Sequence, residues 1–332
     1  MPIALILVSV LLQATADGYL SGRLGVDSSL GFSCLAFVTA TLACTALYAI
    51  RRARSRTRDG GRPAPEPEPE RRRLLLGLMV RMNLATAVTF LGFYLSLAWV
   101  PAALASSVQS GVGPLAVICI GLAAKEKAPA RSRTAYAAVL LALSLAVAVL
   151  LDGRVASLSP AALAGTVLVA VSGASAALLA RLSRRLGRAG ADPTWVMAHR
   201  FHLTYLCAGG VLLVRGTGGK LVAGHIPLPV MAVVALAAVA LPLLLLQIGL
   251  QRADPLAAMV LLSMLPGLVY LTQAVLGGGF RPAPAVLIGA LVLVAALAAR
   301  PPRPAGPPEA ASGAQSPEAA RVSVADSACA VS

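Results

Sequence analysis

Long apolar stretches alternate with short polar connections along most of the chain. A membrane-spanning helix needs about 20 consecutive apolar residues to cross about 30 Å of hydrocarbon. Ten stretches of about this length occur, and each predicts one spanning helix. The predicted spans are Pro2–Leu20, Ser29–Ile50, Leu74–Val100, Pro101–Ala124, Thr134–Leu151, Ser159–Leu182, Thr194–Val214, Pro229–Gln251, Pro255–Leu276 and Pro282–Ala299. The pattern therefore predicts an all-α integral membrane protein with ten transmembrane helices.

Two segments lack this apolar pattern. Arg51–Arg73 mixes basic residues with alternating Pro and Glu, which predicts an extended charged loop. Arg300–Ser332 is rich in Pro, Ala and Ser, a composition that is typical of disorder. The chain is thus expected to divide into a first set of five spans within residues 1–151, a second set within 159–299, and a disordered tail at 300–332.

Composition agrees with lipid as the main solvent. Hydrophobic residues make up 58% of the chain and charged residues 12%, whereas soluble domains carry about 25% charged residues. The net charge of +15 would indicate a nucleic-acid partner in a soluble protein. Here the Lys and Arg residues lie mainly in the connections between apolar stretches, so no nucleic-acid partner is expected.

The basic residues also predict the orientation in the membrane. The even-numbered connections and the tail carry 21 Lys and Arg residues, and the odd-numbered connections carry five. Because cytoplasmic loops are enriched in Lys and Arg, both termini and the 51–73 loop are predicted to be cytoplasmic. The first stretch lacks a basic n-region and is interpreted as a span rather than a removed signal peptide. Frequent Ala and Arg indicate a GC-rich bacterial source, which predicts a multi-pass protein of the bacterial plasma membrane.

Motifs for catalysis, metal binding or cofactor binding are not expected here. The five Cys residues form no CxxC pair, and neither HExxH nor GxSxG occurs. The sequence GTGGKL at 216–221 resembles a phosphate loop but has Val214 and Leu221 where that motif requires Gly and Ser or Thr. An intramembrane enzyme would need paired reactive side chains within spans, and only one acidic residue lies in a predicted span. No enzyme, metal or cofactor is predicted.

A weak internal repeat relates the fourth and ninth spans. With a shift of 152 residues, Leu104 aligns with Leu256, and Pro114 aligns with Pro266. This shift divides ten spans into five and five. Since five is odd, the second half must lie upside down relative to the first. Inverted repeats of this kind are a recurring transporter architecture with the solute site between the halves.

The sequences around these repeated prolines resemble the EamA-type members of the drug/metabolite transporter superfamily. The first copy of the family's short hairpin is LAWVPAALASSVQSGVGPL at 97–115, and the second is GLQRADPLAAMVLLSMLPGL at 249–268. LLARLSRRLG at 178–187 resembles the end of the helix that opens the family's second repeat. The resemblance implies a secondary transporter that works by alternating access and exports a small metabolite, an amino acid or a drug-like solute.

Some positions match the family's pattern and others depart from it. Arg200 matches an Arg that the family often carries near the inner start of the second helix of a repeat. Gly113 and Leu265 stand where an acidic residue often precedes the hairpin proline, and Gln13 stands where a bulky aromatic is common. Pro114 and Pro266 are the hairpin prolines, and the resemblance makes both candidates for the solute cavity.

Charged and titratable residues inside the spans are further candidates for function, because placing charge in a bilayer is costly. Arg81 and Arg200 could line a cavity, or their side chains could extend back to the lipid headgroups. His199 and His202, predicted on one helix face, could transfer protons or merely form hydrogen bonds near the interface. Asp17 could carry a proton or pair with an Arg inside a cavity, or be solvated at the outer interface.

Neutral polar residues complete the candidate set. They could hydrogen-bond a polar solute or one another between packed helices. Small residues at Ser172–Ala177 and Cys207–Gly210 predict close helix packing. The neutral candidates are Gln13, Asn83, Gln109, Gln247 and Gln273.

The expected partners follow from the predicted transporter. They are a small solute, the lipid bilayer and, as a hypothesis that rests on Asp17, His199 and His202, protons. The sequence is compatible with a homodimer and does not decide the oligomeric state. The alternative function is a non-transporting membrane scaffold or partner subunit.

Overall fold

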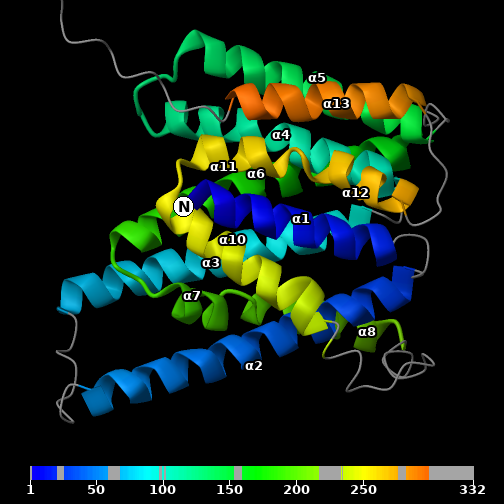
Figure 1. Cartoon of the computed structure of the whole chain (residues 1–332). Helices are drawn as coiled ribbons and strands as arrows, with labels where there is room; N and C mark the ends of the chain where they lie inside the picture. The colour runs from blue at the N-terminus through cyan, green and yellow to red at the C-terminus, as the bar shows by residue number, and fades with distance from the viewer. Residues whose placement is uncertain are drawn as a thin grey trace, which may run out of the picture. The chain divides into compact units, whose positions relative to one another are not determined.

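The computed structural model describes residues 2–20, 26–58, 68–96, 99–100, 102–152, 159–216, 233, 235–275 and 282–298. Within these residues the chain is all-helical and has no β-strand, which confirms the all-α part of the predicted fold class (Figure 1). The helices are α1 Pro2–Leu20, α2 Val26–Arg58, α3 Pro69–Ser96, α4 Ala102–Ala123, α5 Arg131–Asp152, α6 Pro160–Arg188, α7 Pro193–His199, α8 His202–Val214, the π-helix η2 Leu236–Ala240, α10 Leu241–Arg252, α11 Pro255–Leu262, α12 Leu265–Gln273 and α13 Pro282–Ala298.

Several helices have the length and composition of membrane spans. Five helical stretches in the described residues are long and apolar enough to cross a membrane. Large apolar side chains lie exposed on helices throughout the chain, as expected where lipid rather than water covers the surface. These features are those of a membrane protein. The five stretches are Cys34–Arg58, Pro69–Phe93, Leu104–Ala123, Pro160–Arg188 and Pro255–Thr272.

The predicted loop between the second and third spans is wrong at both of its ends. Helix α2 continues to Arg58, and α3 already begins at Pro69, so only 59–68 separate them. Arg is a good helix former, and a helix that has crossed the apolar layer can continue into the polar phase. For the same reason α6 extends past the predicted end of its span at Leu182 to Arg188. The predicted disordered tail lies outside the described residues.

Two predicted spans are interrupted. The predicted span Thr194–Val214 consists of α7 and α8, separated by Arg200 and Phe201. The predicted span Pro255–Leu276 consists of α11 and α12, which separate just before Pro266. Proline removes a backbone donor and crowds the preceding turn, which explains the second interruption. The first has neither Gly nor Pro at the interruption.

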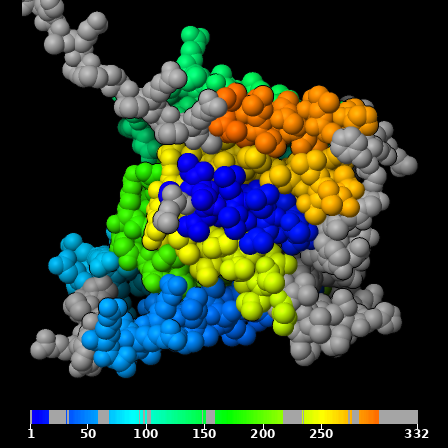
Figure 2. Space-filling model, in the orientation of Figure 1, coloured from blue at the N-terminus to red at the C-terminus, as the bar shows by residue number. Residues whose placement is uncertain are grey.

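Helix α6 packs against helices from early and late parts of the chain. It packs against α3 and α4 of the first half and against α10 and α11 of the second. Helix α1 packs against α10, α11 and α12, and Figure 2 shows α1 lying across these later segments. Elements far apart in sequence therefore form most of the core.

Close helix packing occurs at one of the two small-residue segments. A Cβ on Gly173 would lie 2.5 Å from the carbonyl oxygen of Gln109, so α6 and α4 approach each other there at backbone distance. The prediction for Ser172–Ala177 is thus confirmed. For Cys207–Gly210 it is wrong at its end, because a Cβ on Gly210 would have no atom within 4 Å.

Candidate functional site

The interruption between α7 and α8 places a charged residue inside the protein. Asp192 caps the start of α7, since its Oδ1 accepts hydrogen bonds from the backbone N–H groups of Thr194 (2.7 Å) and Trp195 (3.3 Å). The backbone then leaves regular helical geometry at Arg200 (φ −82°, ψ −14°) and Phe201 (φ −105°, ψ −1°). Both conformations are allowed for any residue. The backbone groups that lose their helix hydrogen bonds here need other partners.

Asn83 of α3 supplies that compensation. Its Nδ2 donates to the carbonyl oxygen of His199 at 2.5 Å, and its Oδ1 accepts from the backbone N–H of Leu203 at 3.3 Å. In a continuous helix the N–H of Leu203 would donate to the carbonyl of His199 itself. The carboxamide of Asn83 is therefore inserted between the two groups of one missing helix bond and satisfies both.

Arg200 is buried at this interruption with only 3% of its surface exposed. Its Nη1 donates to Oε1 of Gln247 at 2.7 Å, and Gln247, on α10, is itself 0% exposed. Ser183 of α6 donates to the same Oε1 at 3.3 Å. Among the described side chains, no carboxylate forms an ion pair with Arg200. The guanidinium is thus held by neutral groups only.

Two donors at this position have no partner. Nε of Arg200 and Nε2 of Gln247 are buried and form no hydrogen bond within the described residues. Leaving a buried donor unpaired costs about 1–3 kcal/mol, and more for a charged group. These donors can therefore bind a hydrogen-bond acceptor from outside the protein, above all an anionic one.

An aromatic cluster covers one side of the Arg200 guanidinium. The Cζ of Arg200 lies 5.0 Å from the ring centre of Phe201, within cation–π distance. Phe201 stacks on Phe37 of α2 with ring centres 5.0 Å apart, and Phe37 contacts Phe90 of α3 edge to face at 4.7 Å. Three of the six Phe residues of the chain gather here. The cluster gives the charge an apolar, polarisable wall.

His199 and His202 lie on either side of the interruption rather than on one continuous helix face. Nδ1 of His199 lies 2.8 Å from the carbonyl oxygen of Trp195, so this nitrogen carries a proton and donates. Nδ1 of His202 lies 2.8 Å from the hydroxyl of Tyr205. The two imidazole rings meet edge to face with centres 5.8 Å apart. Both are half-buried, next to the interruption.

Gln109 and Gln13 belong to two separate polar contacts. Gln109 of α4 donates to Oγ of Ser172 at 2.7 Å, and Ser172 donates to the carbonyl of Thr89 at 2.5 Å, which links α4, α6 and α3. Gln13 donates to Oγ of Ser9 at 2.8 Å. Both glutamines therefore hydrogen-bond other protein groups, which was one of the two alternatives for them.

The Ser9 hydroxyl connects α1 to the second half of the chain. It donates to the carbonyl of Pro242 at 2.7 Å, directly after the π-helix η2. A π-helix leaves its neighbours out of register for regular helix bonds and often marks a functional position. Ser9 therefore binds α10 in its first turn, next to this irregular segment.

The remaining candidates lie apart from Arg200. Arg81 is exposed on α3, which favours the alternative in which its side chain extends to the headgroups. Pro114 is buried within α4, and Pro266 is buried at the start of α12, which packs against α4. The side chain of Asp17 lies outside the described residues, although its backbone belongs to α1.

Sequence reasoning selected Asn83, His199, Arg200 and Gln247, which the structure brings together, but missed Ser183 and the aromatic cluster. A signal for the cluster existed. Phe201 directly follows Arg200 in a chain whose aromatic content is only 4%. Ser183 gave no comparable signal, because it lies in a polar segment that continues beyond the predicted span.

Comparisons with known proteins inform on the fold alone. No protein-family model matches the chain, and no curated protein matches its sequence. A solved crystal structure is similar to it with a TM-score of 0.66, and the match covers 90% of this chain and 97% of the other. The two sequences are 18% identical. The chain therefore shares a full-length helical fold with this protein, and its activity must be inferred from its own residues.

Proposed function

We propose that the protein is a secondary transporter that moves a small solute by alternating access between two inverted five-helix halves, as in the EamA-type transporters that its sequence resembles. The interrupted helices each count as one span in this proposal. Ten spans then result, of which the first five form one half and the last five the other. In order they are α1, α2, α3, α4, α5, α6, α7 with α8, η2 with α10, α11 with α12, and α13.

The packing of the helices supports this division. The third span packs on the sixth (α3 on α6), and the eighth packs on the first (α10 on α1). Likewise α4 packs on α6, while α11 and α12 pack on α1. If each span is replaced by the span five places away in chain order, the contact of the third with the sixth span becomes that of the eighth with the first. The contact of the fourth with the sixth span likewise becomes that of the ninth with the first. Such exchange is what two repeats related by a pseudo-twofold axis would produce.

The observation that carries the proposal is the buried Arg200 at an interrupted helix between the proposed halves. Arg200 and Gln247 belong to the second half, whereas Asn83 and the aromatic side chains of Phe37 and Phe90 belong to the first. Interrupted spans with unpaired polar groups at a repeat interface are typical of transporter solute sites. A buried charge held by neutral groups alone is hard to explain by stability.

The same contacts favour a solute that carries a carboxylate or another anionic acceptor. In the described conformation Oε1 of Gln247 occupies one guanidinium nitrogen of Arg200. An anionic group could replace this amide with charge-assisted bonds, which are about twice as strong as neutral ones. The unpaired Nε of Arg200 and Nε2 of Gln247 would supply the additional donors.

A flux assay tests the proposal. Purified protein is reconstituted into liposomes, and uptake of a panel of amino acids, carboxylates, phosphates and uncharged metabolites is compared with protein-free liposomes. We expect flux of at least one anionic or zwitterionic solute, which Arg200→Gln lowers strongly and Arg81→Gln retains. Absence of flux for the whole panel, together with co-purification of another membrane protein, would favour the scaffold function instead.

The proposal includes orientation and coupling. Both termini and the Arg-rich ends of α2, α3 and α6 would face the cytoplasm of a bacterial plasma membrane, and the solute would be exported. Proton coupling would use the imidazoles of His199 and His202, which lie beside Arg200 in sequence and close to each other in space. Flux driven by an imposed pH gradient, compared between the wild type and His202→Gln, measures this coupling.

A further inference from the structure

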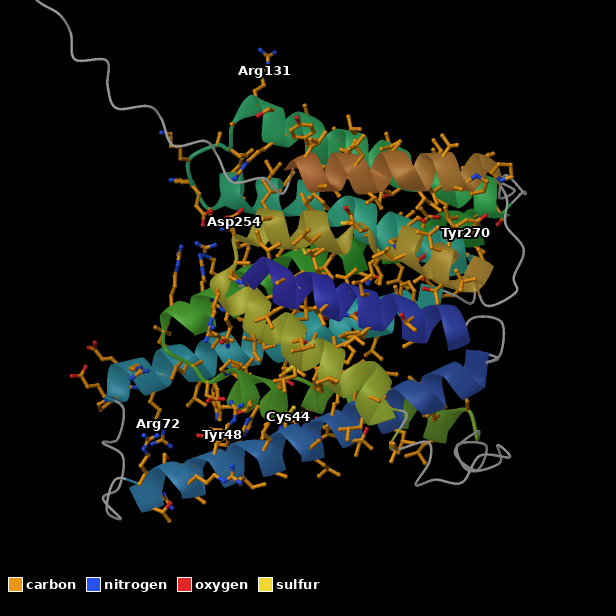
Figure 3. All side chains as sticks on the ribbon, in the orientation of Figure 1. Cys44, Tyr48, Arg72, Arg131, Asp254 and Tyr270 are labelled. Atoms are coloured by element: carbon orange, nitrogen blue, oxygen red, sulfur yellow. The ribbon has the colours of Figure 1, made fainter. Side chains whose placement is uncertain are left out.

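A basic cleft lies at the end of the helices opposite to Tyr270 (Figure 3). It opens between the last turns of α6, the connection from α4 to α5, and the start of α11, and its volume is about 290 Å³. Six basic and two acidic side chains line it, so its formal charge is about four units positive. The charged residues are Lys127, Arg133, Arg181, Arg184, Arg185, Arg188, Glu126 and Asp254.

Half of the cations in the cleft are already engaged. Arg181 pairs with Glu126. Arg184 and Arg133 lie 3.7 and 3.9 Å from the carboxylate of Asp254. The charge of these three arginines is therefore partly neutralised, and their guanidinium groups are held in fixed positions along the cleft.

The other three cations are available. Lys127, Arg185 and Arg188 are exposed and form no ion pair within the described residues. Arg181, Arg184, Arg185 and Arg188 recur at intervals of three and four, so they share one face of α6. An anion in the cleft would thus meet several guanidinium groups from one direction.

The wall of the cleft is apolar on one side. Val117, Ile118 and Leu122 of α4 and Leu256 of α11 line it, and Leu122 is 50% exposed. The cleft lies where α4 ends, at Ala123, and where α11 begins, at Pro255. In a membrane this is the level of the lipid headgroups.

From this combination we infer that the cleft binds the phosphate group of an anionic phospholipid. Guanidinium groups match the geometry of phosphate oxygens and bind them in a bidentate manner. Basic pockets between membrane helices at headgroup level are suited to anionic lipid headgroups. The exposed side chain of Leu122 provides an apolar surface for the glycerol and upper acyl carbons, which a free phosphate ion would not use. This inference does not depend on transport by the protein.

The test is a lipid titration of the purified full-length chain in detergent. The thermal unfolding midpoint is followed while phosphatidylglycerol, phosphatidylcholine or inorganic phosphate is added, since a ligand that binds the folded state raises the midpoint. The variant is Arg185→Gln with Arg188→Gln, which removes two of the available cations. The matched control is Arg54→Gln with Arg58→Gln, which makes the same change of charge on the exposed end of α2.

We expect phosphatidylglycerol to raise the midpoint saturably, with half-saturation shifted roughly tenfold or more upwards in the cleft variant and unchanged in the control. Phosphatidylcholine should have no comparable effect. Saturation by inorganic phosphate with the same sensitivity to the cleft variant would identify free phosphate as the source of the group. Equal saturation in the wild type and the cleft variant, or no difference between the two lipids, would overturn the inference.

Discussion

Arginine side chains in the interior of this protein have different partners from those in the basic cleft at the end of α6. In the basic cleft, Arg181 and Arg184 face the carboxylates of Glu126 and Asp254, and these pairs connect α6 to neighbouring segments. In the interior, Arg200 donates to the amide oxygen of Gln247, which also accepts from the hydroxyl of Ser183. The guanidinium lies against the ring of Phe201 and pairs with none of the described carboxylates. A charge that stabilised the fold would be expected to have a counter-ion. The interior arrangement is the one that the proposed solute site requires, whereas the ion pairs of Arg181 and Arg184 connect helices to neighbouring segments.

The largest effect is expected from removing the interior charge. Arg200→Gln should lower solute flux in liposomes by about tenfold to a hundredfold, because a charged hydrogen bond is worth about 1.5–3 kcal/mol. Arg81→Gln, an equal change of charge on the exposed face of α3, should leave flux within about twofold of the wild type. Equal losses in the two variants would remove the distinction between the interior arginine and a surface one.

Removing the amide that bridges the interrupted helix should be the next largest change. Asn83→Leu leaves the carbonyl of His199 and the N–H of Leu203 without partners, which is expected to lower the free energy of unfolding by about 2 kcal/mol. Chemical unfolding in mixed micelles measures this. Leu84→Ala, at the exposed neighbouring position, is the control and should change stability by less than about 0.5 kcal/mol. Unaltered stability of Asn83→Leu would mean that other groups compensate the interruption.

A pair of glycine substitutions compares tight and open packing. Gly173→Ala places a methyl group against the backbone of Gln109 and should destabilise the protein by about 1–3 kcal/mol. Gly77→Ala, on α3, meets no atom within 4 Å and should be neutral or stabilising by up to about 1 kcal/mol. The same unfolding assay gives both values. A Gly173→Ala protein as stable as the wild type would show that α4 and α6 do not meet at backbone distance.

The smallest changes in stability are expected in the basic cleft. Asp254 caps α11, since its Oδ2 accepts from the N–H of Ala257 at 3.3 Å, and it faces Arg133 and Arg184. Asp254→Asn keeps the cap and should cost less than about 1 kcal/mol, because the carboxylate is 48% exposed. Asp254→Ala also removes the cap and should cost about 1 kcal/mol more. If Asn and Ala had equal effects, the cap would contribute nothing.

Sequence patterns predicted the helices of this protein better than their interruptions. Hydropathy located the first span at the bounds of α1, because the solvent around a helix dictates its composition over its whole length. The interruption before Pro266 could have been anticipated from its proline. The one at Arg200 could not, because Asn83, which satisfies both groups of the broken helix bond, lies 116 residues away from His199.

The candidate site shows the same division between local and tertiary information. Depth in a predicted span made Arg81 and Arg200 equivalent, since each side chain is long enough to reach the headgroups. Their different positions are decided by partners. Arg200 donates a hydrogen bond to Gln247, which lies 47 residues further along the chain, whereas Arg81 is exposed on α3. Residue type thus identified the candidates, and only the packing of the helices separated an interior arginine from a surface one.

The most direct test of the central claim, that the interior arginine binds the solute, is a binding measurement. The solute identified by flux is titrated into purified wild type, Arg200→Gln and Arg81→Gln, and the rise in thermal midpoint is fitted for affinity. The account predicts that Arg81→Gln binds like the wild type and that Arg200→Gln requires at least about tenfold more solute. Identical saturation of all three proteins would contradict it.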